Sequence, residues 1–198
     1  MKTQKRLEEY KKLLLVIDMV KGFITEGNLA DPTVGHIIPS VEELVQKFLK
    51  EGEAVFFIKD THTEESIEFL DFPPHCLKGT EEAELVDALL PYEGRENTYS
   101  IEKNSTSAIF APGFMERIMQ MKNLKQIVGC GCEKDICVPN VLIPLKCYYN
   151  QNNQKVEFIL PENATETYDS PIHNREEYGL MGSKIMKQGG ISLVKKYK

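Results

Sequence analysis

The sequence has few cysteines and no long apolar segment. Its five cysteines are an odd number without regular spacing, a pattern that favours a reducing compartment over a framework of disulfides. No apolar run approaches the length that a bilayer span requires, and the run at residues 13–17 is too short for a signal-peptide core. We therefore expect a cytoplasmic protein with no membrane partner, whose thiols are available for chemistry.

The sequence also lacks an excess of basic residues. Lysine and arginine number 24 against 30 aspartates and glutamates, which gives a formal net charge of −6. Because phosphate binding needs concentrated positive charge, this balance argues against a nucleic acid as partner and favours a small molecule. With 198 residues, of which 41% are hydrophobic and 27% charged, the composition is typical of one compact domain over residues 1–198.

Short apolar runs predict the β-strands. Four runs are continuously apolar, as expected for strands buried on both faces. They lie at residues 13–17, 54–58, 126–128 and 156–160, and a shorter final strand is predicted at residues 191–194. Parallel sheets bind ligands beyond the carboxyl ends of their strands, so the polar residues just after these runs are the candidates for a site. Asp18, Asp60 and the segment through Cys137 meet this condition.

Amphipathic patterns between the strands predict helices. The clearest covers residues 41–49, where apolar side chains recur at three- and four-residue steps behind a capping-box pair, Ser40 and Glu43. Further helices are predicted at residues 81–90, 114–121 and 174–187. Strands that alternate with helices indicate an α/β fold with three layers, αβα, around a mostly parallel, doubly wound sheet.

A carboxylate and two imidazoles follow the second predicted strand. Asp60 and His62 are two residues apart on an extended chain, so their side chains point to the same side and can converge. His75 follows after two consecutive prolines and completes a donor set that suits Zn, Fe or Mn. Glu68 is a candidate fourth ligand and is equally consistent with a solvated surface carboxylate. The alternative for Asp60 and His62 is a polar strand end that faces water.

Cys137 lies where a glycine-containing strand end passes into a helical pattern. A helix that begins there would aim backbone N–H groups at the sulfur, which favours a thiolate and can stabilise an oxyanion. Pro139 suits the first turn, and Pro144 should end or kink the helix. On pattern alone, a buried structural cysteine is the commoner outcome. Asp18 as proton carrier and Lys103 as a charge that lowers the thiol pKa would suit a nucleophile, although each is also consistent with an ordinary polar residue.

The remaining cysteines are predicted to pack against apolar neighbours. Cys130 and Cys132 alternate along a strand, so one should face the core and the other the site. Cys76 and Cys147 are also expected to behave as small apolar side chains, with metal binding as the alternative for Cys76.

Four segments carry a family likeness. They are residues 16–23 (VIDMVKGF), 59–62 (KDTH), 72–80 (FPPHCLKGT) and 135–138 (DICV). With them the chain resembles the nicotinamidases, within the isochorismatase-like cysteine hydrolases, and the likeness runs over residues 13–194. The third segment is the most specific, since it separates metal-dependent nicotinamidases from relatives without the metal site.

The resemblance implies a role for each candidate residue. It makes Asp18, Lys103 and Cys137 the catalytic triad. It makes Asp60, His62 and His75 the metal ligands, with Glu68 like the extra carboxylate ligand of some members. Phe23 and Phe72 resemble the aromatic walls around a pyridine ring, and core packing is the alternative for both. The oxyanion hole would use the backbone N–H groups of Glu133 and Cys137, with a cis peptide between Cys132 and Glu133.

The chain also departs from the family pattern. Lys134 stands where Thr or Ser is common, and Phe72 stands where Trp is common. The aromatic residues usual a few positions after the lysine of the triad are replaced within residues 105–110, so the pocket for the ring is expected to differ in shape.

The activity that the resemblance implies is hydrolysis of nicotinamide to nicotinate and ammonia through a thioester, in NAD salvage. Pyrazinamide is a further candidate substrate. The resemblance also implies one divalent metal ion per chain, with Zn favoured over Fe or Mn, and a homo-oligomer. A metal-independent relative that acts on a carbamoyl, ureido or vinyl-ether substrate is the first alternative. A metal-binding or interaction module that has kept the fold without the activity is the second.

Overall fold

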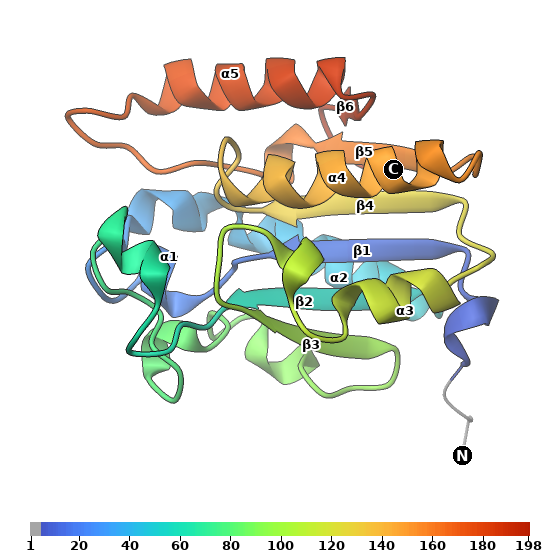
Figure 1. The fold of residues 1–198 in the computed structure, drawn as a ribbon, viewed down its shortest axis with the longest axis horizontal. Coiled ribbons are helices and arrows are strands. Elements are labelled where there is room, and N and C mark those ends of the chain that lie inside the picture. The colour runs from blue at the N-terminus through green and yellow to red at the C-terminus, as the bar shows by residue number, and fades with distance from the viewer. Residues whose placement is uncertain (1–4) are drawn as a thin grey trace.

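The structure, a computed structural model, describes residues 5–198. Within these residues, six parallel strands form one sheet in the order β3-β2-β1-β4-β5-β6 (Figure 1). The strands are β1 (Lys12–Ile17), β2 (Ala54–Asp60), β3 (Thr98–Lys103), β4 (Gln126–Gly131), β5 (Glu157–Pro161) and β6 (Ser192–Val194). The chain winds outward from β1 in both directions, which confirms the predicted doubly wound α/β fold.

The central strand β1 is apolar on both of its faces. Leu13, Leu15 and Ile17 are fully buried in one core cluster, whereas Leu14 and Val16 are fully buried in another on the opposite face. Successive side chains of a strand point to opposite faces, so a continuous apolar run is what a strand covered on both sides requires. Burial of each such side chain contributes about 1.5–3 kcal/mol to stability.

Helices cover both faces of the sheet (Figure 1). The α-helices are α1 (Lys21–Ile24), α2 (Ile38–Lys50), α3 (Phe114–Gln120), α4 (Cys137–Gln151) and α5 (Arg175–Gln188). Helix α2 packs through Val41 and Phe48 into the cluster of Leu14, while α3 and α4 pack into the cluster of Leu13 on the other face. Short 3-10 helices occupy the connections, at Leu7–Glu9, Pro32–Ile37, Ile67–Leu70, Glu81–Ala83, Leu90–Tyr92, Ala108–Phe110 and Glu162–Ala164. No helix within residues 5–198 is long and apolar enough to cross a membrane.

Two elements differ from the sequence prediction. The helix predicted at residues 81–90 is wrong, because Glu81–Ala83 forms one 3-10 turn and Leu85 pairs with Val20 in an antiparallel bridge. The buried residues there anchor a loop beside α1 instead of lining a helix. Strand β3 was not predicted, since only Thr98, Ile101 and Lys103 of this edge strand are buried and it contains no continuous apolar run.

Local details of the predicted helices also differ. Helix α2 begins at Ile38 with a proline in its first turn, so the predicted capping box at Ser40 is wrong, and the Ser40 hydroxyl accepts a hydrogen bond from Asn163 instead. Helix α4 continues through Pro144 to its end at Gln151, so this proline does not end the helix. Cys147 is exposed on α4 and does not pack in the core.

The polar residues at the carboxyl ends of the strands lie together at one edge of the sheet. Asp18 follows β1, Asp60 ends β2 and Lys103 ends β3, where it is the register partner of Asp60. Strand β4 ends at Gly131, whose φ of 109° favours glycine and where a Cβ would lie 2.0 Å from the carbonyl oxygen of Ile17. Only glycine therefore lets β4 turn beside β1 into the segment that leads to α4.

Candidate active site

Asp18, Lys103 and Cys137 converge at this edge of the sheet. The Lys103 Nζ lies 2.9 Å from Asp18 Oδ2 and 3.8 Å from Cys137 Sγ. Cys137 is the first residue of α4, which places its sulfur at the helix N-terminus as predicted. All three residues are almost completely withdrawn from solvent, with 0%, 1% and 4% exposure for Asp18, Lys103 and Cys137. The three residues proposed from the sequence therefore form one contiguous, water-excluded group.

Burial and mutual charge set the protonation of this group. Burial raises the pKa of Asp18 to about 6, while the Lys103 cation opposes the shift. Burial also raises the pKa of Cys137 well above its usual value, against the lowering effect of Lys103. Burial therefore favours the thiol over the thiolate that the helix start had suggested. A largely ionised carboxylate beside a neutral thiol can accept its proton during a reaction.

Asp60, His62 and His75 form a second cluster that shares Lys103 with the first. Asp60 Oδ2 lies 3.1 Å from His62 Nε2 and 3.2 Å from His75 Nε2, and these two nitrogens are 3.1 Å apart. The other oxygen of Asp60, Oδ1, accepts a 2.8 Å hydrogen bond from Lys103 Nζ. Burial alone would raise the pKa of Asp60, but Lys103 and the imidazoles lower it below its usual value, so this side chain is an anion.

Outer hydrogen bonds orient both imidazoles toward a common point. His75 Nδ1 lies 2.8 Å from the carbonyl oxygen of Pro73, which can only accept, so Nδ1 carries the proton and Nε2 carries the lone pair. His62 Nδ1 lies 3.0 Å from Asn104 Oδ1, which assigns the same tautomer. Two lone pairs and a carboxylate oxygen that converge in this way repel one another unless a cation lies between them. The donor set fits a divalent metal ion such as Zn, Fe or Mn.

Glu68 is brought to the same cluster by the 3-10 helix Ile67–Leu70. One potential ligand atom from each of Asp60, His62, Glu68 and His75 can be chosen so that all lie within 4.8 Å of one another. The Glu68 carboxylate also accepts a 3.0 Å hydrogen bond through Oε2 from the backbone N–H of Thr106. This contact holds Glu68 at the site, so a fourth carboxylate ligand is compatible with the geometry.

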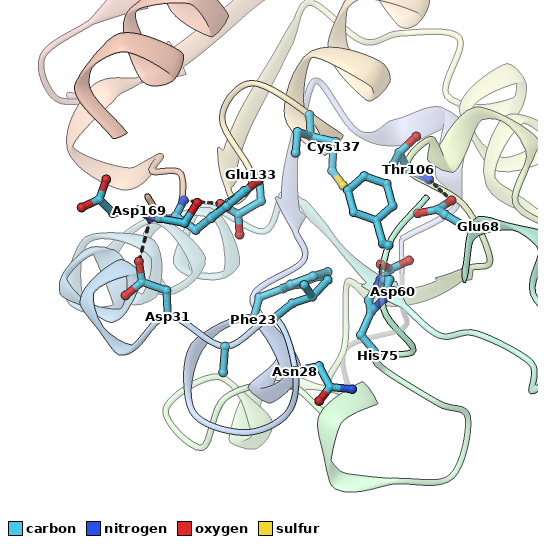
Figure 2. A pocket seen from close by; sticks show the side chains of 16 residues that line it. Phe23, Asn28, Asp31, Asp60, Glu68, His75, Thr106, Glu133, Cys137 and Asp169 are labelled. Carbon is cyan, nitrogen blue, oxygen red and sulfur yellow. Dashed lines mark hydrogen bonds and ion pairs between the residues drawn. The ribbon is translucent and has the colours of Figure 1, made fainter. Parts of the chain in front are cut away.

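A cavity of about 300 Å³ joins the two clusters (Figure 2). Its walls include Cys137, the proposed metal ligands Asp60, Glu68 and His75, and both of the predicted aromatic residues, Phe23 and Phe72. The Phe23 ring lies 5.6 Å from the His75 ring between centroids, and the Phe72 ring lies 6.3 Å from it. Asp18, Lys103 and His62 lie behind the cavity wall. Lys103 contacts Asp60 and Cys137 of the wall, His62 contacts Asp60, and Asp18 contacts Cys137.

The loop that precedes Cys137 has the backbone conformation that the resemblance predicted. The peptide bond between Cys132 and Glu133 is cis. The Glu133 carbonyl accepts hydrogen bonds from the backbone N–H groups of Ile136 and Val138, which closes the loop onto the first turn of α4. Cys130 and Cys132 both pack in the core cluster of Leu14, and neither lines the cavity, so the expectation that one of them faces the site is wrong.

One wall of the cavity was missed at the sequence level. It contains the Glu133 side chain, Tyr168, Asp31 and Asp169. Asp31 Oδ2 lies 2.7 Å from Arg175 Nη2 and accepts a 2.9 Å hydrogen bond from the Asp169 backbone N–H. Asp31 lies more than a hundred positions before the other three residues, and the four share no local motif. Of these residues, only Glu133, an acidic residue just after the apolar strand β4, could have been noticed in the sequence.

A buried pair beside this wall was missed as well. His173 Nε2 lies 2.8 Å from Asp135 Oδ2, two residues before Cys137, and the imidazole is stacked between Tyr168 and Tyr178 with ring centroids 3.9 Å from each. The pair ties the segment that leads into α5 to the loop of the cysteine.

Comparison with known proteins identifies the class. Residues 12–176 match the Isochorismatase domain family, and the chain therefore belongs to the isochorismatase family of hydrolases. The chain is 33% identical over 172 residues to the uncharacterized isochorismatase family protein PncA of Bacillus subtilis, with 82% of this chain and 90% of the relative covered. It is 28% identical over 177 residues to Nicotinamidase 1 of Arabidopsis thaliana, with 81% and 71% covered.

Solved structures share the fold along almost the whole chain. The pyrazinamidase of Pyrococcus horikoshii in complex with zinc superposes with a TM-score of 0.73 at 25% identity, over 93% of this chain and 98% of that one. The N-carbamoylsarcosine amidase of Thermoplasma acidophilum superposes with a TM-score of 0.72 at 23% identity, over 92% and 95%, and this second likeness shows the fold alone.

Proposed function

We propose that the protein is a metal-dependent nicotinamidase, which hydrolyses nicotinamide to nicotinate and ammonia through a thioester on Cys137. The observation that carries the proposal is the shared cavity, in which Cys137 and the donor set of Asp60, Glu68 and His75 face the same space beside Phe23. A cysteine alone would suit many amide substrates. A cysteine opposite a metal-binding set suits a substrate with a carboxamide on one side and a ring nitrogen on the other. The likeness to Nicotinamidase 1 and to a zinc-bound pyrazinamidase supports this choice.

In the first half of the reaction, the Cys137 sulfur attacks the carboxamide carbon while Asp18 takes the thiol proton. The backbone N–H groups of Glu133 and Cys137 donate hydrogen bonds to the oxyanion of the tetrahedral intermediate. As the intermediate collapses, the C–N bond breaks and Asp18 returns the proton to the departing ammonia. The product of this half is a thioester between Cys137 and the nicotinoyl group.

In the second half, Asp18 accepts a proton from water as the water attacks the thioester carbon. The C–S bond breaks, and Asp18 returns the proton to the sulfur, which restores the thiol of Cys137. Nicotinic acid leaves and loses its carboxyl proton to solvent as nicotinate. Lys103 stays protonated throughout, because Asp18 and Asp60 raise its pKa against the lowering effect of burial. Its charge stabilises the sulfur while negative charge develops there.

The aromatic and ligand residues position the substrate for these steps. Phe23 and Phe72 line the cavity and provide apolar faces for a pyridine ring. A divalent cation would be held by Asp60, His62 and His75, together with Glu68. When bound, the cation would accept the ring nitrogen of the substrate as a further ligand. Positioning of this kind lowers the barrier because the carboxamide carbon and the sulfur meet in a near-attack geometry.

Trapping of the thioester tests the proposed chemistry. Rapid acid quench of the enzyme with nicotinamide, followed by mass spectrometry, should find a nicotinoyl group on the peptide that contains Cys137. Cys137→Ala should bind substrate and form no adduct. An adduct on another residue, or nicotinate formation by Cys137→Ala at the wild-type rate, would exclude Cys137 as the nucleophile.

A further inference from the structure

The side chain of Glu133 is a buried carboxyl that faces the reaction space. The residue lies in the loop between β4 and α4, lines the same cavity as Cys137 and is 5% exposed. Its Oε2 accepts a 2.8 Å hydrogen bond from the backbone N–H of Tyr168, which fixes the orientation of the carboxyl group. In Figure 2, Glu133 lies on the opposite side of Phe23 from Asp60 and His75. It is therefore placed on the side of the cavity away from the metal-binding set.

This carboxyl has no cationic partner among the described residues. The two other carboxylates on this wall are held by Arg175, since Asp31 pairs with its guanidinium and Asp169 accepts its backbone N–H. Lys103, the nearest buried cation of the site, is already bonded to Asp18 and Asp60. An unpaired buried carboxylate is costly, so the neutral acid is the favoured form.

The titratable side chains around Glu133 are acids. Asp18 after β1 and Asp135 in the same loop are acidic, Cys132 at the end of β4 is a buried thiol, and Tyr168 packs from the following segment. Burial first, and then Asp135 and Asp18, raise the pKa of Glu133 to about 8, against the lowering effect of hydrogen bonds from Tyr168 and Thr167. Near neutral pH the group therefore retains a proton that it can donate.

We propose that the Glu133 side chain is a substrate-binding residue, which donates a hydrogen bond to the carbonyl oxygen of the carboxamide and to the oxyanion that forms from it. The inference rests on the proposed function, because it adds a side-chain donor to the oxyanion hole in which the backbone N–H of the same residue takes part. The Tyr168 N–H occupies Oε2, and in the neutral acid Oε1 carries the proton that is donated. When Glu133 ionises it loses this donor and places a negative charge beside a developing negative charge. Activity should therefore fall as the pH rises through the pKa of Glu133.

The pH dependence of two Glu133 variants tests the inference. Glu133→Gln keeps an acceptor for Tyr168 and has an N–H donor at every pH, so its kcat for nicotinamide should stay high above pH 8, where that of the wild type falls. Glu133→Leu has no donor and should lose about 10²-fold in kcat at neutral pH. Glu166→Gln, a nearby carboxyl variant outside the cavity, should keep the alkaline decline of the wild type.

The outcomes separate this inference from the function on which it rests. If wild-type enzyme releases no ammonia from nicotinamide, the proposed function is overturned and the inference with it. If wild type is active but Glu133→Gln retains the alkaline decline, the inference alone is overturned. Should Glu133→Leu fail to fold, the comparison of wild type with Glu133→Gln still decides. Infrared difference spectra give a second readout, because the band of a protonated carboxyl at pH 7 should be absent from Glu133→Gln.

Discussion

Lys103 contacts both halves of the site. Its ammonium group bonds to Asp18 at 2.9 Å and to Asp60 at 2.8 Å, with no exposure to solvent for the side chain. Such a cation is indispensable once the carboxylates are buried, because removal of one partner leaves an uncompensated charge in a low-dielectric interior. The lysine therefore links the protonation of the cysteine group to the charge of the metal-binding group.

Substitution of Lys103 by methionine should damage stability and activity together. The variant keeps most of the side-chain volume and loses the charge, so the free energy of unfolding should fall by about 3–5 kcal/mol at neutral pH. Urea denaturation followed by circular dichroism measures this loss. Lys78→Met is the matched control, because the exposed Lys78–Glu102 pair should contribute no more than about 1 kcal/mol. Equal stability of the two variants would contradict the role assigned to Lys103.

The pKa of Asp18 predicts the acid limb of the pH profile. Burial raises this pKa to about 6, and only the ionised carboxylate accepts the thiol proton, so kcat/KM should rise with pH through about 6 and level off above it. Steady-state kinetics between pH 5 and 7.5 measure the limb. The metal content must be checked at each pH, since protonation of histidine ligands would produce a similar decline. A flat profile with constant metal content would exclude Asp18 as the proton acceptor.

Ionisation of Asp18 also affects stability. In the folded protein the pKa of Asp18 is raised to about 6, above its ordinary value, so folding favours the protonated carboxyl. The stability that this preference contributes is fully present at low pH and is lost as the pH rises toward and through about 6. Asp18→Asn should therefore unfold at a higher temperature than wild type at pH 7.5, with a smaller difference at pH 4. Calorimetry at the two pH values measures the change. Asp18→Asn should also be inactive. A variant that is more stable but inactive would show that the Asp18 carboxylate serves catalysis at the expense of stability.

At the scale of elements, α5 and the cysteine loop are held unusually close. A Cβ on Gly182 would lie 2.5 Å from the Lys134 carbonyl oxygen and 2.9 Å from the Asp135 Cα, both backbone atoms of that loop. A Cβ on Gly179, one turn earlier on the same helix, would have no neighbour nearer than 3.8 Å. The helix thus approaches the loop through a position where a side chain cannot fit.

This contrast gives a matched pair of substitutions. Gly179→Ala should stabilise the protein by about 0.5–1 kcal/mol, because alanine favours the helix and meets no clash. Gly182→Ala should destabilise it and lower kcat, since α5 can accommodate the methyl group only by displacing the loop that carries Cys137. Thermal unfolding and nicotinamide turnover of both variants check the prediction. If Gly182→Ala were as active and as stable as Gly179→Ala, the close packing would have no bearing on the loop.

The sequence predicted the buried central strands but missed an edge strand and placed one helix wrongly. The buried central strands were predicted because a strand covered on both faces must be apolar at every position, as residues 13–17 are. Edge strand β3 (Thr98–Lys103) was missed, because half of its side chains face away from the core and the pattern becomes ambiguous. At residues 81–90 a helix was predicted because apolar residues such as Leu85 and Leu89 are spaced as on a buried helix face. These two residues are buried, but in a loop whose backbone hydrogen bonds are made with Met19 and Lys21.

For the whole molecule, a parallel sheet explains why the site could be predicted from short motifs. The ends of adjacent parallel strands meet at one edge of the sheet, so Asp18 and Asp60 both come within hydrogen-bonding distance of Lys103. The predicted strands pointed to Asp18 and Asp60, whereas Lys103, whose strand β3 was missed, depended on the family resemblance. The opposite wall could not be found in this way. Tyr168 and Asp169 reach the cavity through a connection after β5, and the contact of Asp169 with Asp31 depends on how two loops pack.

Metal binding should couple the site to the stability of the whole chain. An ion that binds only the folded protein stabilises it by about 2.7 kcal/mol at a free concentration of one hundred times Kd. Chelation should therefore lower both the Tm and the turnover of nicotinamide, and addition of Zn, Fe or Mn should restore both. His62→Ala should bind metal weakly and show little response to chelator. Full turnover by protein that elemental analysis shows to be free of metal would favour a metal-independent amidohydrolase.

Ammonia release from nicotinamide is the most direct test of the proposed function. The assay compares wild-type protein loaded with one divalent metal ion per chain, the same protein after chelation, and metal-loaded Cys137→Ala. We predict rapid ammonia release by the first, a large loss that metal restores in the second, and none above background in the third. Equal release by wild type and Cys137→Ala, or no release by metal-loaded wild type, would contradict the assignment of a cysteine and a metal-binding set to one nicotinamidase site.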